Sequence, residues 1–596
     1  MEIVERKSGC TVTTGSYSVE IDADNGTFRY CRNNAVIYHG NLDIKVNTDA
    51  LSEESTVFNR MTDIKKSDSE CTITYQYMSN LYSKKEIVMV FREDYFFVKA
   101  IVYGNRQAVS DIVYFSSEEC DGYQSYISPR FDWIKKQIHK SVSESDVISC
   151  QQWISPPPFS FILTDDVTYC AVGVMAKAGC NNFISMTFEG ASKSISLQME
   201  GHTDVSGKYE TPAIVFAKEA NEWDAALKNY IDVLSCEGAI AGTGMRHVPD
   251  WWRQPIFCGW GQMRYEYRQD HDGGEFGSFV NVTDYCMQSR YMNYLNALER
   301  RGINPGTVII DMGWAKQAAL AEPNTYKWQD LRGFIDEQHE KGRHVLLWYT
   351  PLVFQGLPKE ACLLLQSRPV APDPTNPVYQ SILKDQIRKM LSDDADALNA
   401  DGFKIDFTQN TPSESGVFTR YYDSFWSFDS FDMQKHTYKA RSERKDLIQT
   451  YVPGIWGVEL LRKYIENIYG FMKQVKDDSV LITHTANPYF ADVVDVLRLN
   501  DLDGECEDVL EVMKTRAKIA KACCGEWLID TDNDLMINKE RWRQYITLQP
   551  QLGIPDTYYA TNIACSGEVF GDDEYELLKD VWNKYRSENH LNDGSK

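Results

Sequence analysis

The chain has 596 residues, which is too long for one hydrophobic core and predicts at least two domains. Hydrophobic residues make up 43% and charged residues 25%, a composition typical of folded globular proteins. The formal net charge of −24 disfavours nucleic acid and anionic membranes as partners, because like charges would meet. We therefore expect no nucleic-acid partner and no membrane partner, whereas a neutral sugar carries no such electrostatic penalty.

The start of the chain, MEIVERKSGC, lacks the apolar core of a secretory signal, and no run of about 18 apolar residues follows it. These features predict a cytoplasmic protein without a membrane span. The 15 cysteines are scattered and are expected to be reduced thiols. Neither the cysteines nor the histidines show zinc-ligand spacing, so we expect no metal and no other cofactor.

Residues up to about 215 alternate polar and apolar side chains and contain frequent turn signals, such as Asn25-Gly26 within SYSVEIDADNGTFRY. This texture predicts a large antiparallel β-sandwich. The segment EWDAALKNYIDVL, near 222–234, has helical spacing and predicts a linker helix. We place the domain boundary near 245, with a β-sandwich domain and linker helix over 1–245 and a second domain over 246–596.

The second domain alternates short apolar strands with longer helical segments, which is typical of parallel βα units. Eight such units predict a closed (β/α)₈ TIM barrel with insertions. Residues 408–470 are expected to be an insertion after the fourth strand, and DEYELLKDVWNKYRSE a closing helix. The predicted strands are 255–260, 308–314, 344–351, 402–407, 480–485, 493–499, 526–531 and 553–561.

Carboxylates follow several of these strands. Asp311 ends the second strand, Asp406 the fourth and Asp530 the seventh, while Asp501 follows the sixth. In this fold the active site is built at the C-terminal ends of the strands. A single Asp at such a position is explained equally well as a helix N-cap, but acidic residues at four strands favour an active site.

The fourth strand, GFKIDF, carries the strongest signal. Lys404 and Asp406 share one face of the strand, because side chains alternate, while Phe403, Ile405 and Phe407 take the other face and are expected to pack on helices. We expect the Lys404 ammonium to keep the Asp406 carboxylate ionised, as a nucleophile requires. The alternative is a buried ion pair without a catalytic role.

Glycosidase chemistry needs a second carboxyl group that is protonated at the working pH. Asp501 and Asp503, in LRLNDLDGE, are the candidates, and we favour Asp501. Arg498 lies close in sequence, where it either lowers the pKa of one of these carboxyls or binds a sugar hydroxyl.

Together the segments IIDMGW, KWQDLRGFIDEQHEKGRHVLLWYTP, GFKIDF and LRLND resemble glycoside hydrolase clan D, specifically family 36 α-galactosidases and their relatives. The resemblance covers most of the chain and implies a β-sandwich before the barrel. It implies a retaining, exo-acting α-glycosidase that works through a glycosyl-enzyme intermediate on an oligosaccharide or glycoside, and it is compatible with a homo-oligomer. The implied roles are nucleophile for Asp406, acid/base for Asp501, hydroxyl binding for Asp311, Lys404 and Arg498, and subsite lining for Trp260, Trp314 and Trp348.

Three features depart from the family pattern. Met312 replaces the second Asp of the Asp-Asp-Gly-Trp motif, which removes a hydrogen-bond acceptor, so galactose is not assured. HTANPYFAD replaces the usual Cys-containing loop after the fifth strand, and its His484 and Asn487 are candidate hydrogen-bonding groups for the substrate. As the third departure, we expect the usual C-terminal β-domain to be absent.

Four other functions remain open at this point. GFKIDF also resembles the nucleophile strand of family 31 α-glucosidases and α-xylosidases, although Thr408-Gln409 stand where that family has Gly-Glu. A transglycosidase of the raffinose-synthase type would share the chemistry and differ in the acceptor. A non-catalytic carbohydrate-binding relative would not need Lys404 and Asp406. A metal-dependent hydrolase would use the acidic segment DTDND, which lacks the Gly and distal Glu of a calcium loop.

Overall fold

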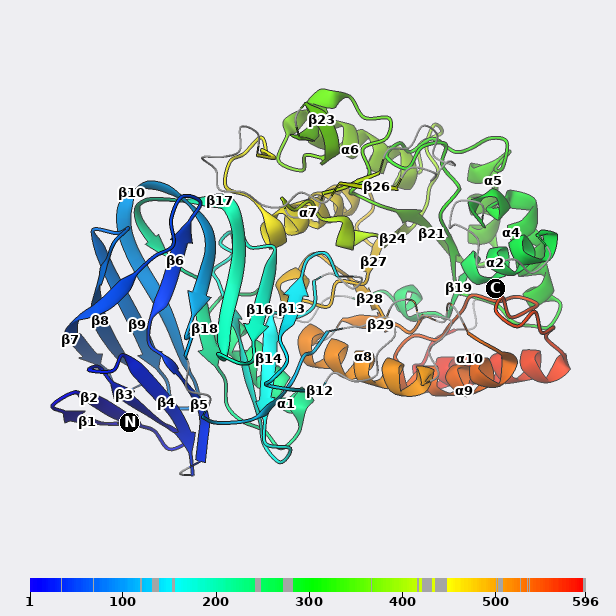
Figure 1. Cartoon of the computed structure of the whole chain (residues 1–596). Helices are drawn as coiled ribbons and strands as arrows, with labels where there is room; N and C mark the ends of the chain where they lie inside the picture. Colours follow the sequence, from blue (N-terminus) through cyan, green and yellow to red (C-terminus); the bar gives the residue numbers. More distant parts are fainter. Residues whose placement is uncertain are drawn as a thin grey trace.

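The computed structural model describes the chain except for residues 34, 68, 118–120, 131–138, 153–155, 242–247, 272–281, 366, 415–416, 421–430, 435–446, 500, 502–507, 526, 533, 535 and 593–596. Antiparallel sheets form the N-terminal part, and a parallel barrel forms the rest (Figure 1). This arrangement confirms the predicted fold class. The predicted boundary near residue 245 lies outside the described residues.

The N-terminal part contains a five-stranded and a 13-stranded antiparallel sheet. The smaller sheet follows chain order: β1 (Glu2–Arg6), β2 (Gly9–Thr13), β3 (Ser18–Asp22), β4 (Thr27–Arg32) and β5 (Ala35–Asn41). The larger sheet contains β6 (Ile44–Thr48), β7 (Ser55–Lys66), β8 (Cys71–Ser79), β9 (Lys84–Phe91), β10 (Phe96–Tyr114), β11 (Ser125–Ile127), β12 (His139–Ser141), β13 (Asp146–Ser149), β14 (Ser160–Thr164), β15 (Tyr169–Met175), β16 (Ser185–Glu189), β17 (Ser194–Glu210) and β18 (Ala213–Phe216).

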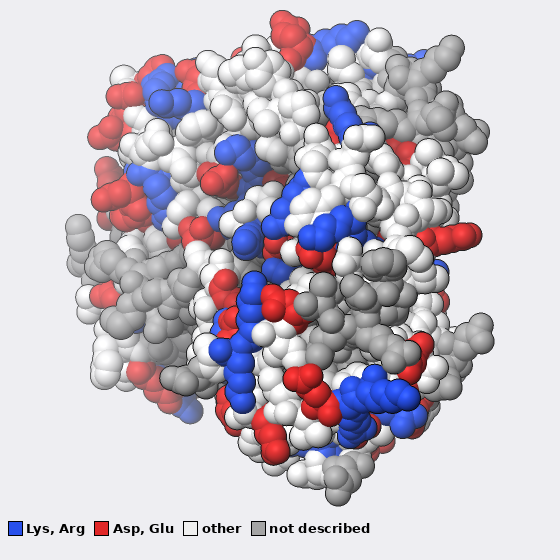
Figure 2. Space-filling view, turned by 90° about the vertical axis from the view of Figure 1, so that its left-hand side faces the viewer, with Lys and Arg blue, Asp and Glu red and all other residues white. Residues whose placement is uncertain are grey.

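Aromatic side chains fill the space between the two sheets. Phe28 of β4 contacts Phe216 of β18 edge to face, and Phe216 stacks on Phe96 of β10 with ring centroids 4.7 Å apart. All three are buried, so they contribute both apolar area and ring–ring contacts to the sandwich core. On the outer face of the larger sheet, charged side chains pair across strands, as Lys99 of β10 does with Glu210 of β17 at 2.6 Å. Figure 2 shows basic side chains gathered across the middle of the face that this part turns outward, with acidic ones around them.

The predicted linker helix is present as α1 (Trp223–Cys236). Its buried side chains include Leu227, Tyr230 and Leu234, which lie at helical spacing on one face. The helix packs against β15 of the sandwich and α8 (Val509–Cys524) of the barrel. The helix therefore packs against both domains as well as joining them along the chain.

All eight predicted barrel strands are present. They are β19 (Ile256–Cys258), β20 (Thr307–Ile310), β21 (His344–Tyr349), β24 (Gly402–Ile405), β27 (Val480–Thr483), β28 (Val496–Arg498), β29 (Leu528–Asp530) and β30 (Asp556–Thr557). Neighbours pair in parallel in this chain order, β30 returns to pair with β19, and a parallel bridge between Asp530 and Ile554 joins the last two strands. The strands are buried almost throughout, as expected for a sheet covered on its outside by helices.

The helices around the barrel are α2 (Trp260–Asp270), α4 (Gln288–Glu299), α5 (Leu331–Glu340), α6 (Pro377–Leu391), α7 (Gly457–Val475), α8, α9 (Lys539–Leu552) and α10 (Asp572–Glu588). Short hairpins interrupt this order: β22 (Cys362–Leu365) pairs with β23 (Arg368–Pro372), and β25 (Val417–Arg420) with β26 (Phe431–Gln434). Short 3-10 turns are η1 (Asp250–Arg253), η2 (Thr283–Tyr285), η3 (Lys359–Ala361), η4 (Thr408–Asn410) and η5 (Pro488–Phe490). Between β27 and β28, residues 484–495 form only η5, so one βα unit lacks its helix.

Helix α5 forms where its sequence predicts. Asp330 caps its first turn by accepting a hydrogen bond from the Gly333 amide at 2.8 Å. Leu331, Phe334 and Ile335 form the buried stripe. Gly342 then adopts a φ of 74°, a left-handed conformation that ends the helix at low cost because glycine has no Cβ.

Asp401 joins several elements at the end of the barrel where the strands begin. Its carboxylate accepts hydrogen bonds from the Val345 amide at 2.8 Å and His339 Nε2 at 2.8 Å, and Lys476 Nζ lies at 3.2 Å. Burial raises the pKa of Asp401, but its bonds to His339 and His344 and the Lys476 charge outweigh this and hold the pKa below the ordinary value. Residues at this end of a TIM barrel usually serve stability.

Asp401→Asn should therefore destabilise the protein by roughly 3 kcal/mol, because it leaves buried partners without their counter-charge. The thermal unfolding midpoint, measured by calorimetry, should fall by several degrees at neutral pH. Because the folded pKa of Asp401 is depressed, its contribution is present above about pH 4 and is lost as the pH falls below that. The midpoints of wild type and variant should therefore converge in acid, whereas Asp385→Asn, in an ion pair whose Asp side chain is 53% exposed, should change little at any pH.

Candidate active site

The C-terminal ends of the barrel strands bring the predicted carboxylates together. Asp311 directly follows β20, Asp406 follows β24, and Asp501 comes three residues after Arg498, the last residue of β28. Asp406 and Asp501 face one pocket with about 330 Å³ of empty volume. Its lining consists of Trp260, Asp311, Met312, Trp348, Lys404, Asp406, Phe407 and Asp501.

Lys404 forms its shortest ion pair with Asp311 and not with Asp406, which corrects the sequence-based expectation. Its Nζ lies 2.6 Å from Asp311 Oδ2 and 3.3 Å from the Tyr558 hydroxyl. Cys258 Sγ donates to the same Asp311 oxygen at 3.1 Å. Lys404 lies in β24, two residues before Asp406, and its side chain reaches Asp311, which follows β20, two strands away in the barrel. It still adds favourable charge to Asp406, but as the smallest of several contributions.

Asp406 is held by neighbours from three other strands. The Trp348 indole donates to its Oδ2 at 3.1 Å, while His484 Nε2 and Arg498 lie 3.5 Å from its Oδ1. Burial raises the pKa of Asp406, but its hydrogen bond with His484 and the Arg498 charge outweigh this, and the pKa lies well below the ordinary value. The carboxylate is therefore ionised at neutral pH, as a nucleophile requires.

Asp501 has the opposite electrostatics. Burial raises its pKa to about 7, although Arg498 donates to its Oδ1 at 2.8 Å and opposes the rise. The negative charges of Asp532, Asp534 and Asp406 add to the effect of burial. A carboxyl with this pKa is largely protonated below neutral pH, so it can donate a proton to a leaving group.

Arg498 links the two candidate catalytic groups. Its side chain is 1% exposed, and its terminal nitrogens contact Asp406 at 3.5 Å, Asp501 at 2.8 Å and Asp532 at 2.8 Å. Because Asp406 and Asp501 touch the same rigid guanidinium, their facing oxygens lie within roughly 9 Å of each other. This upper limit includes both the separation of about 5 Å that is typical of retaining glycosidases and the roughly 6.5 to 9.5 Å that is typical of inverting ones.

The backbone turns sharply directly after Asp406. Phe407 has a φ of 58°, a left-handed conformation that costs a residue with a Cβ about 1 kcal/mol or more. Its amide donates to Asp406 Oδ1 at 2.9 Å, and its ring contacts Trp348 edge to face. The prediction that Phe407 packs on helices is therefore wrong, because the turn moves its ring from the outer face of the strand into the pocket wall.

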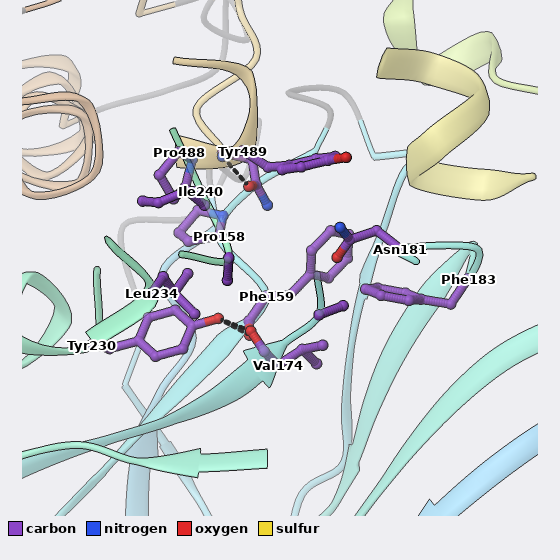
Figure 3. Close-up of a pocket in the computed structure, with 13 residues that line it drawn as sticks. Pro158, Phe159, Val174, Asn181, Phe183, Tyr230, Leu234, Ile240, Pro488 and Tyr489 are labelled. Atoms are coloured by element: carbon purple, nitrogen blue, oxygen red, sulfur yellow. Dashed lines mark hydrogen bonds between the residues drawn. The ribbon is translucent and has the colours of Figure 1, made fainter. Parts of the chain in front are cut away.

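Two predicted substrate contacts, Trp314 and Asn487, have other positions. The Trp314 indole is buried and donates to the Trp348 carbonyl at 2.9 Å, so it supports a pocket residue and does not line the pocket. Asn487 donates to the Pro157 carbonyl at 2.9 Å and accepts from the Tyr489 amide at 3.0 Å. It lies at an apolar pocket of about 350 Å³ between the two domains, where Pro488 and Tyr489 approach Phe159 and Asn181 (Figure 3). Asp503 lies outside the described residues.

Sequence reasoning missed several members of the cluster. Asp532, in the acidic segment DTDND, is fully buried against Arg498, and Tyr558 of the last βα unit contacts Lys404. Asp532 directly follows the predicted strand 526–531, and Tyr558 lies within the predicted strand 553–561, so their positions along the chain were usable signals. Within the described residues, no group of three or more His, Cys, Asp or Glu side chains could hold a metal ion, and no helix is long and apolar enough to cross a membrane.

Comparison with known proteins agrees with this geometry. Residues 275–475, about a third of the chain, match the model of the Glycosyl hydrolases family 31 TIM-barrel domain. The protein is a glycoside hydrolase. The sequence resembles family 36, but the match points to family 31, which belongs to the same clan. Both share the nucleophile strand with its Lys-x-Asp pattern, so this motif could not separate them. No curated protein matches the sequence closely enough to be a relative.

Solved structures show a similar fold at low identity. A family 31 sulfoquinovosidase from E. rectale is 13% identical and aligns over 98% of this chain and 83% of its own, with a TM-score of 0.55. An α-galactosidase from Thermus thermophilus is 11% identical over 90% of this chain and 98% of its own, with a TM-score of 0.49. A family 31 α-xylosidase from a soil metagenome is 12% identical over 98% and 84%, with a TM-score of 0.48. The first likeness shows a shared fold across both domains.

Proposed function

We propose that the protein is a retaining, exo-acting α-glycosidase with Asp406 as nucleophile and Asp501 as general acid/base. One observation carries this proposal: two carboxyl groups that contact one arginine have pKa values displaced in opposite directions. Asp406 would attack the anomeric carbon while Asp501 gives its proton to the departing oxygen. Asp501 would then take a proton from the water that hydrolyses the glycosyl-enzyme intermediate.

The other pocket residues have roles that follow from their contacts. The ion pair of Lys404 with Asp311 presents a charged donor and acceptor at the pocket, suited to sugar hydroxyls. Trp260 and Trp348 supply rings for the C–H faces of a sugar. Met312 lines the same pocket without a hydrogen-bond acceptor, where the α-galactosidases that the sequence resembles carry a second Asp. This favours an α-glucoside or α-xyloside over an α-galactoside, in line with the family 31 match.

A panel of nitrophenyl α-glycosides, with the first product analysed by NMR, tests the proposal. We expect the α-anomer of the free sugar to appear first, because two displacements retain configuration. We expect kcat/KM for the glucoside or xyloside to exceed that for the galactoside by about tenfold or more, the effect of one unpaired buried hydroxyl. Release of the β-anomer first, or hydrolysis of β-glycosides only, would contradict the mechanism. Repeating the assay with added sugar acceptors distinguishes a hydrolase from a transglycosidase.

A further inference from the structure

A buried carboxylate of the N-terminal domain contacts the loop that follows Asp406. Glu200 lies in β17 and is 2% exposed. Its Oε1 accepts a hydrogen bond from the Ser413 hydroxyl at 2.7 Å, and its Oε2 accepts from the Glu414 amide at 2.9 Å and the Trp456 indole at 3.0 Å. All three donors belong to the barrel. Hydrogen bonds to a buried carboxylate are stronger than those between neutral groups.

The sandwich strand is distorted at the point where it presents Glu200. β17 pairs regularly with β10 up to Gln198 and again from Thr203, but its register shifts between these residues. Within this bulge Glu200 has a φ of 51° and Gly201 a φ of 76°. The left-handed conformation is unfavourable for Glu and persists only where its surroundings fix it. Bulges of this kind re-aim a side chain, and here the side chain is aimed out of the sandwich into the barrel.

A second pair of contacts fixes the same segment. His202, also in the bulge, lies 3.1 Å from Glu414 Oε1, and its ring stacks on Trp456 with centroids 3.7 Å apart. Glu414 Oε1 also accepts from the Ile448 amide at 2.8 Å. Residues 413–414, 448 and 456 are therefore gathered on one site of the sandwich, although up to 43 positions separate them along the chain.

This segment is connected to Asp406 through a short series of contacts. Thr411 donates its hydroxyl to the Thr408 carbonyl at 2.7 Å, and the Gln151 side chain from the sandwich donates to the Thr411 carbonyl at 3.0 Å. The Thr408 hydroxyl lies 3.5 Å from His484 Nδ1, while His484 Nε2 faces Asp406. Burial lowers the pKa of His484, so the neutral ring can accept from Thr408 and donate to Asp406.

We propose that Glu200 is a positioning residue for the glycosidase centre, which acts by holding residues 408–414 so that Thr408 and His484 orient Asp406. The proposal rests on the proposed function of Asp406. It explains why the strained bulge in β17 ends on a buried carboxylate. It also gives the N-terminal domain a role in the chemistry of the barrel without any contact to the substrate.

Glu200→Ala and Glu200→Gln test the proposal, with Glu53→Ala as the matched control. Glu53 is a sandwich carboxylate of similar burial, 1% exposed, that accepts from the Val46 amide at 2.7 Å and pairs with Lys85 at 3.0 Å within its own domain. We expect Glu200→Ala to lower kcat by about 10- to 100-fold with KM changed less than about threefold, because a misplaced nucleophile slows chemistry more than binding. Glu200→Gln can still accept two hydrogen bonds and donate one to Ser413, so kcat should recover to within about fivefold of wild type.

The pH profile separates positioning from general destabilisation. The groups that face Asp406 are His484, Arg498, Lys404, Trp348 and Asp501. If Glu200→Ala loosens His484, the pKa of Asp406 should rise, and the acid limb of kcat/KM should move to higher pH. Glu53→Ala should lower the thermal midpoint without moving that limb. A folded Glu200→Ala protein with wild-type kcat and an unmoved acid limb would overturn the proposal, as would an equal loss in Glu53→Ala.

Two further measurements keep the test decisive. If Glu200→Ala does not fold, Ser413→Ala removes one of the three donors, and its kcat should fall about three- to tenfold; a wild-type kcat would overturn the proposal. Amide hydrogen exchange over residues 403–414 reports positioning without an activity assay, and it should accelerate in the folded Glu200 or Ser413 variant but not in Glu53→Ala. Should the wild-type protein hydrolyse no α-glycoside, the proposed function fails, while the exchange result still decides whether Glu200 holds this loop.

Discussion

Replacing Asp406 with alanine is expected to lower kcat on any α-glycoside by at least about 10⁴-fold, because the glycosyl-enzyme can no longer form. The fold should survive, since the change removes a carboxylate that is itself costly to bury, and Arg498 keeps its contacts with Asp501 and Asp532. The thermal midpoint and kcat, measured on the same preparation, separate loss of chemistry from loss of structure. Asp492→Ala, at a carboxylate 41% exposed, is the control and should keep wild-type activity.

Sodium azide gives the Asp406→Ala experiment its sharpest readout. The cavity left by the side chain admits a small anion on the face that Asp406 occupied. Azide should restore turnover by attacking the anomeric carbon directly, with the aglycone leaving as it takes the Asp501 proton. A single displacement inverts configuration, so an α-glycoside should give a β-glycosyl azide. Activity within about tenfold of wild type, without azide, would show that Asp406 is not the nucleophile.

The barrel could be predicted from the sequence because its signals are local. Each strand is a short apolar run that ends near a polar residue, as in GFKIDF, and burial on both faces removes the alternation of a solvated sheet. Asp311, Asp406 and Asp501 could be chosen because strand ends converge at one end of the fold. The family resemblance implied that Trp260 and Trp348 line the subsite, and both line the pocket.

The partners of these residues could not be predicted, because partners depend on contacts between strands. Lys404 and Asp406 lie two positions apart on one face, yet Lys404 bonds Asp311, 93 positions earlier in the chain. Asn487 looked available for a sugar, but its loop turns towards Pro157 of the sandwich. Glu200 carries no local signal at all, since only docking of the two domains brings it to Ser413.

Replacing Asp501 with alanine should produce an effect that depends on the leaving group. A glycoside with a poor leaving group needs the Asp501 proton, so its kcat/KM should fall by about 10²- to 10⁴-fold. A dinitrophenyl glycoside needs little protonation, so its first step should stay within about tenfold of wild type, and the glycosyl-enzyme should accumulate as a burst. Azide should here yield the α-glycosyl azide, because it replaces water in the second displacement and Asp406 still performs the first. Equal losses for both substrates would contradict the assignment.

The pH profile identifies the group that loses its proton. Because burial raises the pKa of Asp501 to about 7, wild-type kcat/KM on a poor leaving group should fall as the pH rises through that value. The limb should vanish in Asp501→Ala. Asp530 is the necessary control, since burial also raises its pKa to about 7. If Asp530→Asn abolishes the limb and Asp501→Ala retains it, Asp530 and not Asp501 governs the profile.

The second displacement makes a further demand on the same carboxyl. Asp501 must be protonated for the first step and ionised for the second, and the negative charge of Asp406 is one cause of its raised pKa. Once Asp406 is esterified to the sugar, that charge is gone while the Arg498 contact at 2.8 Å can remain, so the pKa of Asp501 should fall. With a dinitrophenyl glycoside, where the second step limits turnover, kcat should rise with pH along a limb below pH 7. A limb at the same pH as that of kcat/KM would mean that the two carboxyls do not influence each other across Arg498.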